Sequence, residues 1–176
     1  DICRINGSSY AYEIKTEYDT FDRLGSQMQD YLRTFEKVYV IVPIGRVNDV
    51  KNLIPESCGI ISYRITKNRE VVFSYQKCAQ KNCCDIKFCL DSLSSGDMSY
   101  LLKLLNEKDF KTRADKRTRL LQIAATRSIW TLYRKLLRHK YADQWRFITE
   151  HFDQILPVDI QSFFSSKMDP NLLYAK

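Results

Sequence analysis

The sequence lacks clustered glycines and is poor in histidine. Its five glycines are isolated from one another, which excludes a G-x-G-x-x-G dinucleotide loop and a Walker-type phosphate loop, because both need neighbouring glycines. Only His139 and His151 are present, so an H-E-x-x-H zinc site is absent. The longest apolar run, Val38–Ile44, falls far short of the roughly 18 residues that span a bilayer. We therefore expect neither a membrane span nor these cofactor sites.

Positive charge is present in excess and is concentrated in one segment. The 176 residues carry a formal net charge of +7. Residues 1–110 have as many basic as acidic residues, whereas residues 111–147 have eleven basic residues and only Asp115 and Asp143 as acidic ones. A local excess of this kind predicts one element that faces a polyanion. The chain begins with Asp1 rather than Met, and we expect upstream residues to be missing.

The first half of the chain has the pattern of an α/β fold. Asp19 is the expected N-cap of an amphipathic helix that ends near Phe35. The run Val38–Val42 that follows is apolar and β-branched, which is typical of a strand buried on both faces. A strand, a helix and a buried strand in this order predict a parallel βαβ unit. The expected strands are Asp1–Ile5, Tyr10–Lys15, Val38–Val42, Cys58–Ile65 and Val71–Tyr75, with a short helix near Val47–Leu53.

The second half of the chain is predicted to be helical. Thr112 and Asp115 resemble a capping box, which would open one long helix that continues to about Leu137. Further helices are expected around residues 98–105 and 141–152 and after Pro157. We therefore predict an α/β core over residues 1–95 and a basic helical region over residues 96–176.

Glu13 and Lys15 form a candidate catalytic pair. Side chains alternate along a strand, so these two lie on one face while Ile14 points to the other. A carboxylate beside an ammonium group can bind a divalent cation and hold a water for attack on phosphorus. The alternative is a solvated ion pair on an edge strand, which would contribute little.

Asp1 adds to this pair if the hairpin turn has the right length. A two-residue Asn6-Gly7 loop would place Asp1 on the face opposite Glu13, whereas a loop with an odd number of residues sets Asp1 directly across from Glu13. Two opposed carboxylates repel each other, and a divalent cation between them removes that penalty. The hypothesis of a metal site therefore requires an odd turn.

These residues resemble the PD-(D/E)XK nuclease superfamily, and more narrowly a branch of bacterial and phage restriction-endonuclease-like proteins. The resemblance rests on Asp1, Glu13-x-Lys15, a helix with Gln27-x-x-x-Tyr31 and the buried strand that follows. It implies a mixed sheet in which Asp1 and Glu13 ligate Mg²⁺ or Mn²⁺ and Lys15 positions the attacking water. It also implies that Gln27 and Tyr31 lie beside the site, although an i,i+4 pair on a helix flank is an equal alternative.

The basic region is a candidate nucleic-acid interface. On a helical wheel the basic side chains of the expected long helix gather on one side, away from an apolar stripe. Such a stripe can follow a phosphate backbone, although a solvated face is an equal alternative. The candidates are Arg23 at the start of the first helix and Lys116, Arg117, Arg127, Arg134, Lys135 and Arg138.

Six cysteines are present and no export signal is visible, so we expect reduced thiols and a cytoplasmic location. Four of them cluster at Cys78, Cys83, Cys84 and Cys89. A structural zinc site and disulfides are less favoured alternatives, because adjacent cysteines rarely ligate one metal.

Together these features predict a Mg²⁺-dependent endonuclease, a hydrolase of phosphodiester bonds that binds DNA. Two alternatives remain open. One is a catalytically inactive nuclease-like module that binds nucleic acid or a protein partner. The other is an RNA-cleaving, toxin-like domain. Double-strand cutting with one site per chain would favour a homodimer.

Overall fold

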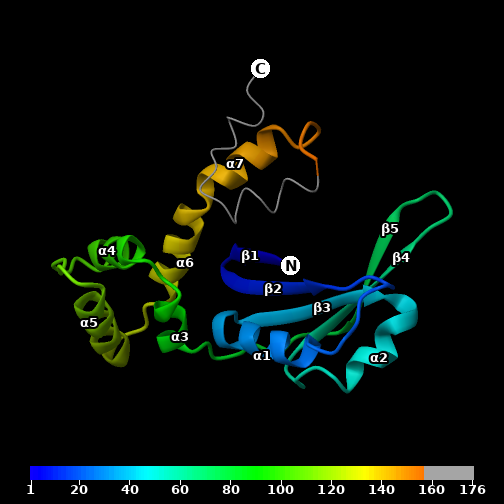
Figure 1. Ribbon diagram of the computed structural model, residues 1–176, viewed down its shortest axis with the longest axis horizontal. Coiled ribbons are helices and arrows are strands. Elements are labelled where there is room, and N and C mark those ends of the chain that lie inside the picture. The colour runs from blue at the N-terminus through cyan, green and yellow to red at the C-terminus, as the bar shows by residue number, and fades with distance from the viewer. Residues whose placement is uncertain (157–176) are drawn as a thin grey trace.

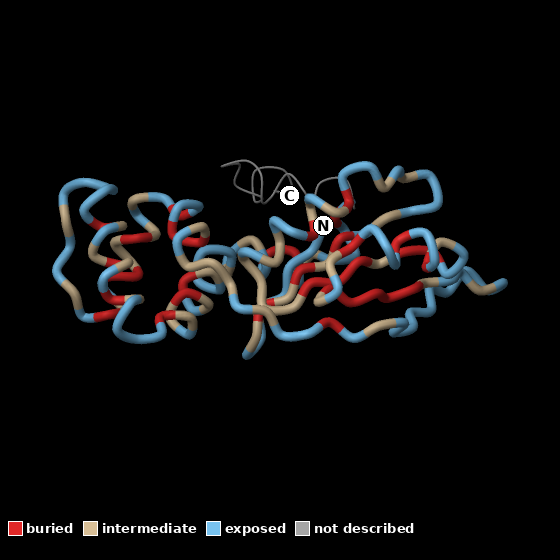
Figure 2. The backbone as a smooth tube through the Cα atoms, turned by 90° about the horizontal axis from the view of Figure 1, so that it is seen from below, coloured by how far each residue is buried: buried red, intermediate tan, exposed pale blue. Residues whose placement is uncertain are grey.

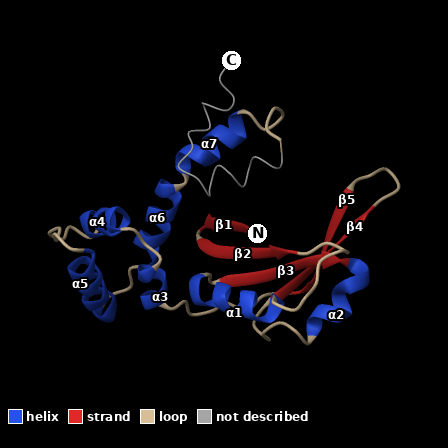
Figure 3. Cartoon of the chain, viewed as in Figure 1, coloured by secondary structure: helices blue, strands red, loops and turns tan. Residues whose placement is uncertain are grey.

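The computed structural model describes residues 1–156, which form a mixed α/β unit followed by helices (Figure 1). The α/β unit contains β1 (Ile2–Asn6), β2 (Ser8–Ile14), α1 (Leu24–Thr34), β3 (Lys37–Pro43), the short 3₁₀ helix η1 (Ile44–Arg46), α2 (Val47–Lys51), β4 (Gly59–Ile65) and β5 (Val71–Lys77). The helices that follow are α3 (Ile86–Asp91), α4 (Ser95–Leu104), α5 (Arg113–Thr126), α6 (Trp130–Lys140) and α7 (Ala142–Glu150). Figure 3 shows the strands confined to one side of the molecule and α3 to α6 gathered on the other. The predicted fold class, a mixed-sheet core followed by helices, is confirmed.

The five strands form one sheet in the order β1-β2-β3-β4-β5. The inner pairs β2–β3 and β3–β4 are parallel, whereas the two outer pairs are antiparallel. β3 lies in the centre, which agrees with its predicted burial on both faces. One face packs against α1 and α2, where Leu24 and Met28 meet Val38 and Val40 in a continuous core.

The opposite face of the sheet is rich in tyrosine. The rings of Tyr10 and Tyr12 are stacked, Tyr12 stacks on Tyr39, and Tyr75 meets Tyr39 edge-on. The row depends on Gly59, which pairs with Tyr39 across β3 and β4. A Cβ at Gly59 would overlap the Tyr39 ring, so this close approach requires glycine.

The helical unit has a core of its own and starts earlier than residue 96. Cys89 and Leu90 of α3 pack with Leu101, Leu120 and other side chains of α4, α5 and α6. Figure 2 shows the buried residues in two groups, one in the sheet unit and one in the helical unit. The predicted helical region continued to residue 176. Its residues 157–176, with the helix expected after Pro157, lie outside the described residues.

The prediction of one helix from Thr112 to Leu137 is wrong. α5 ends at Thr126, the backbone of the next residue, Arg127, is extended, and α6 begins after Ile129. Ile129 is 2% exposed and joins the core, and α4 packs against both α5 and α6. The chain breaks because two shorter helices can bury their apolar sides against α4, whereas one straight helix would carry the second half away from it. Thr112 is the N-cap of α5 as predicted, and its hydroxyl accepts a hydrogen bond from the backbone N–H of Asp115. The Asp115 carboxylate accepts from the Thr112 hydroxyl, which differs from the pairing of the predicted capping box.

The start of α1 also differs from the prediction. Asp19 is not its N-cap: the Asp19 carboxylate accepts hydrogen bonds from the backbone N–H and hydroxyl of Thr16 and closes a turn before the helix. α1 begins at Leu24, after Arg23. None of the helices within residues 1–156 has the length and apolarity that a membrane span requires.

The two units are joined at the C-terminal end of α1. The Glu36 carboxylate accepts a hydrogen bond from Arg134 of α6 at 2.9 Å, another from the backbone N–H of Ser9, and lies 3.4 Å from the Lys81 ammonium. Arg33 of α1 lies over the ring of Phe88. α6 is therefore held against the end of the sheet that carries the β1–β2 turn.

Candidate active site and basic cleft

The β1–β2 hairpin sets Asp1 across from Glu13. Its pairs run from Ile2 with Tyr12 to Asn6 with Ser8, around a turn at Gly7. Gly7 has a φ of 71°, a conformation that glycine adopts without strain. Continued by one step, this register pairs Asp1 with Glu13. The odd turn that the metal-site hypothesis required is present.

All five predicted site residues come together on the α1 side of the sheet. Glu13 is 2% exposed, and its Oε1 lies 2.8 Å from Nζ of Lys15. Lys15 follows β2 directly, and its Nζ also donates to Oε1 of Gln27 at 3.2 Å. The Tyr31 hydroxyl lies 2.7 Å from Oδ2 of Asp1 and 3.0 Å from Oε2 of Glu13. Gln27 and Tyr31 therefore face the site from successive turns of α1.

The Tyr31 hydroxyl has one proton and two carboxylate neighbours. It can donate to only one of them at a time, so no proton lies between the hydroxyl oxygen and the oxygen of the other carboxylate. Burial and the hydrogen bond to Glu13 raise the pKa of Tyr31 above its usual range, so the phenol stays protonated at neutral pH. The side chains of Asp1, Glu13 and Lys15 together carry a net charge of −1, which favours a further cation.

The donor set fits a hard divalent ion that keeps part of its hydration shell. Within residues 1–156 no group of three or more histidine, cysteine or acidic side chains is placed to hold a metal, and the site offers two carboxylates, Asp1 and Glu13. Mg²⁺ is commonly held by one or two carboxylates, with water and substrate phosphates as its remaining ligands. Zn²⁺ would need a more complete set of nitrogen and sulfur ligands.

Most of the predicted nucleic-acid-binding cations are engaged within the protein. Because the long helix is broken, they do not form the predicted single stripe. Lys116 is 7% exposed and donates to the Ser99 hydroxyl, and Arg117 pairs with Asp91. Arg127 caps α5 and lies near the carbonyl oxygen of Leu105.

Three of the predicted cations keep free head groups. Within the described residues, Arg23, Lys135 and Arg138 form no hydrogen bond or ion pair through their side chains, and all three are exposed. Arg23 precedes α1, one turn before Gln27, and so lies on the flank of the helix that faces the active site. Lys135 and Arg138 lie on α6.

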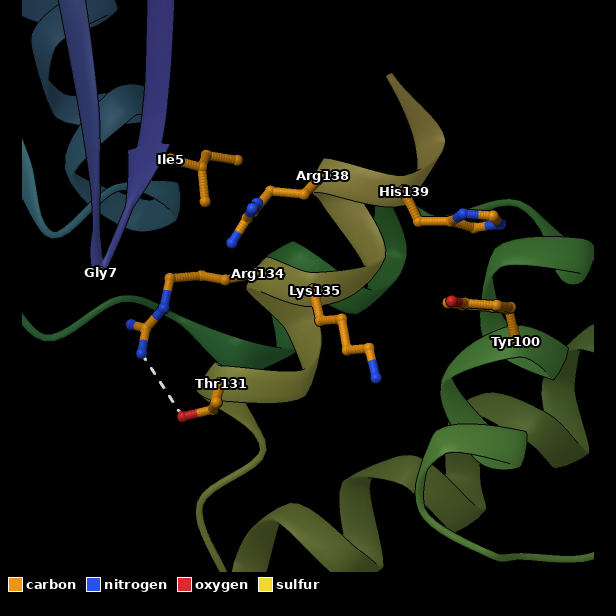
Figure 4. A pocket seen from close by; sticks show the side chains of 8 residues that line it. All are labelled: Ile5, Gly7, Tyr100, Thr131, Arg134, Lys135, Arg138 and His139. Carbon is orange, nitrogen blue, oxygen red and sulfur yellow. Dashed lines mark hydrogen bonds between the residues drawn. The ribbon is translucent and has the colours of Figure 1, made fainter. Parts of the chain in front are cut away.

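A cleft of about 600 Å³ lies between α6 and the β1–β2 turn. Figure 4 shows Arg138 reaching from α6 toward Ile5, Arg134 turned toward Thr131, and Tyr100 facing His139 from α4. The Tyr100 and His139 rings are stacked with centroids 4.5 Å apart. Sequence analysis named Arg134, Lys135 and Arg138 but missed the cleft, because its walls come from separate elements. The lining residues are Ile5, Gly7, Tyr100, Thr131, Arg134, Lys135, Arg138 and His139, without a carboxylate.

The cysteines do not converge on a metal in the described residues. Cys78 and Cys83 are exposed, whereas Cys89 is buried in the helical core, and each cysteine described is a free thiol. Burial raises the pKa of the Cys84 thiol to about 12, so this group is protonated at neutral pH.

Comparison with known proteins gives the family of the chain. The sequence pattern of the family described as "Bacteriophage P4 protein cII" matches residues 1–163. The chain belongs to this family. Protein cII of Enterobacteria phage P4 is 29% identical over 73 residues, which are 42% of this chain and 27% of that protein. The chain thus aligns with about a quarter of the length of this cII protein, and no solved structure matches it.

Proposed function

We propose that this member of the cII family is a Mg²⁺-dependent nuclease of the PD-(D/E)XK type that hydrolyses phosphodiester bonds in DNA. One observation supports the proposal above the others: the odd β1–β2 turn brings Asp1 opposite Glu13, beside Lys15, and α1 adds Gln27 and Tyr31 to the same cluster. A solvated ion pair would need neither the turn parity nor these partners, and Glu13 would not be buried.

Asp1 and Glu13 would hold the metal ion, which supplies charge neutralisation at the phosphate and lowers the pKa of a bound water. The Lys15 ammonium has three donors, and Glu13 and Gln27 take two of them. The third is left for the attacking water or a phosphate oxygen. In the reaction the water oxygen bonds to phosphorus, the bond to the leaving oxygen breaks, and that oxygen takes up a proton.

Tyr31 and Gln27 act as positioning residues. Tyr31 holds the two carboxylates near each other through its hydroxyl, and Gln27 fixes the direction of the Lys15 side chain. Because both side chains come from α1, a single helix sets the geometry of the acidic and the basic members of the site.

The test is cleavage of plasmid DNA and of RNA with Mg²⁺, with Mn²⁺ and with EDTA. We expect cleavage of DNA that EDTA abolishes and that Glu13→Gln and Lys15→Gln each reduce by at least about 10²-fold, as for loss of one transition-state contact. Glu17→Gln is the matched control, because Glu17 is an exposed carboxylate close by in the chain. Equal cleavage by Glu13→Gln and the parent would refute the proposal.

Two results would favour the other functions. If the parent binds DNA but cuts neither nucleic acid, the fold is an inactive binding module. Cleavage of RNA alone would indicate a ribonuclease with the same site. Melting curves of each variant are needed beside the assay, since loss of Glu13 leaves Lys15 without its ion-pair partner.

A further inference from the structure

We infer that the cleft between α6 and the β1–β2 turn binds the phosphate backbone of the nucleic-acid strand whose scissile bond lies at Asp1 and Glu13. This inference rests on the proposed function for the position of the scissile bond. The binding role of the cleft itself rests on charge and geometry alone. Hereafter the cleft is the space lined by Ile5, Gly7, Tyr100, Thr131, Arg134, Lys135, Arg138 and His139.

Two of the three cations of the cleft differ from other basic residues of the helical unit, whereas the third, Arg134, is paired with Glu36. Arg117 pairs with Asp91, Arg119 with Glu107 and Lys140 with Asp97. Lys135 and Arg138 have no such partner within residues 1–156, and no carboxylate lines the cleft. Arg138 lines the cleft on the side of the β1–β2 turn and Lys135 on the side of α4 (Figure 4). Two unneutralised cations along one concave surface attract an anion, and phosphates suit both Lys and Arg.

The remaining walls of the cleft favour a nucleic-acid strand over a small anion. A volume of about 600 Å³ is larger than a single phosphate requires. The stacked Tyr100 and His139 offer ring surface at one side, and the Gly7 turn offers a backbone without a side chain at the other. Aromatic rings beside cations are the combination that accepts bases as well as phosphates.

The β1 strand connects the cleft to the candidate active site. Side chains alternate along a strand, so Asp1, Cys3 and Ile5 share one face of β1, with Asp1 in the site and Ile5 in the cleft. The four-residue step from Asp1 to Ile5 spans about 13 Å at roughly 3.3 Å per residue. This equals the axial rise of about four base pairs in B-DNA at 3.4 Å each.

The proposed path of the nucleic-acid strand also continues past the candidate active site, on the side away from the cleft. α1 runs from the site to the β1–β2 turn, since Glu36 just beyond its end contacts Ser9 while Gln27 contacts Lys15. The free Arg23 therefore lies on the side of the site away from the cleft. A strand held by Lys135 and Arg138 at one end and by Arg23 at the other would cross the carboxylates between them.

The experiment measures DNA binding in EDTA, so that cleavage does not contribute. Affinity of a labelled 20-nucleotide single strand and of its duplex is determined by fluorescence anisotropy at several salt concentrations. Lys135→Gln combined with Arg138→Gln should weaken binding at least about 10-fold. The slope of log affinity against log salt should fall by about 1.4 for the single strand and about 1.8 for the duplex, from 0.7 and 0.9 per phosphate contact.

The matched control is Lys111→Gln combined with Lys103→Gln, two surface lysines that do not line the cleft. This control should leave the slope unchanged. An unchanged slope in the cleft variant, or an equal fall in the control, would overturn the inference. Both cleft residues are exposed and unpaired, so their substitution should not alter the melting temperature.

A second measurement separates this inference from the proposed function. Cleavage of a long DNA should fall in the cleft variant, whereas cleavage of a dinucleotide, too short to reach the cleft, should not. If DNA is never cut but the salt slope falls as expected, the nuclease proposal fails and the cleft remains a binding site. In the opposite case the parent cuts DNA while the cleft variant changes neither DNA binding nor the cleavage of long DNA. That result would refute binding by the cleft and leave the nuclease proposal intact.

Discussion

The two units of the molecule use charged residues in opposite ways. In the α/β unit, which is nearly neutral over its length, Asp1, Glu13 and Lys15 converge at one point and leave a negative charge for a ligand to balance. In the helical unit, which holds the positive excess, many of the cations are paired one by one with carboxylates, such as Arg117 with Asp91 and Arg119 with Glu107. The net charge of a segment therefore overstates the charge that it can offer to a partner.

The largest expected effect comes from a change that moves Asp1 away from Glu13 and Lys15 in the α/β unit. Insertion of one glycine after Gly7 shifts the hairpin pairing by one residue and moves Asp1 to the other face of the sheet. We expect DNA cleavage to fall at least about 10²-fold, as for loss of one electrostatic contact to the reacting group. Insertion of two glycines restores the parity and should restore most of the rate. Equal losses with one and with two glycines would show that turn length rather than parity matters.

The helical unit depends on its apolar core rather than on its cations. Leu120 is fully buried among α3 to α6, so Leu120→Ala should lower the free energy of unfolding by about 2–5 kcal/mol, measured by urea denaturation. The exposed Lys111→Gln on the same unit should change it by less than about 0.5 kcal/mol. A change below about 1 kcal/mol at Leu120 would contradict its central place in this core.

The junction of the two units rests on Glu36. Burial acts to raise its pKa, but the hydrogen bond from Ser9 and the charges of Arg134 and Lys81 outweigh this and lower the pKa below its usual value. Glu36→Gln should reduce the free energy of unfolding by about 1–3 kcal/mol at pH 7, because the partly buried Arg134 loses the charge of its partner.

The pH dependence of this pair has a defined sign. A lowered folded-state pKa means that Glu36 stabilises the fold fully above its unfolded pKa of about 4.3, and that this stability is lost as the pH falls through the folded-state value. The gap between the parent and Glu36→Gln should therefore narrow below about pH 4. A constant gap down to pH 3 in urea titrations would show that the carboxylate charge is not involved.

The smallest expected effect concerns a cation that looked functional in the sequence. Lys116 is buried and donates to Ser99, with Asp109 at 3.4 Å. Lys116→Met keeps its volume and removes a desolvated charge, so we expect a change in unfolding free energy within about 1.5 kcal/mol and no change in DNA affinity. Weaker DNA binding by this variant, in the anisotropy assay used for Lys135 and Arg138, would remove the distinction between paired and free cations.

The candidate site was predictable because it depends on local rules. Strand alternation sets Glu13 and Lys15 on one face, and helix periodicity sets Gln27 and Tyr31 one turn apart. The parity of the turn then decides where Asp1 lies, and this could be stated as a requirement although the sequence left the turn length open.

The basic interface was not predictable in the same way. No proline or glycine marks the break between α5 and α6, and Arg127 and Ser128 are compatible with a continuing helix. The break follows from the packing of Ile129 and Leu136 against α3 and α4, which is a tertiary effect. Which cations are paired depends likewise on contacts such as Arg117 with Asp91, which lie 26 residues apart. The N-terminal end of α1 was misplaced for a local reason, because Asp19 caps a turn as readily as a helix.

The contact between Tyr39 and Gly59 has a consequence for sequence change in the family. The ring of one residue occupies the volume that a side chain on the other would need. A Cβ at position 59 would also lie 2.7 Å from the backbone nitrogen of Ala79, so the glycine is enclosed by the ring on one side and by the chain that follows β5 on the other. A small residue at position 39 would remove the clash with the ring but not the one with the backbone nitrogen of Ala79, so a relative with this fold should keep glycine at position 59 whatever it carries at position 39.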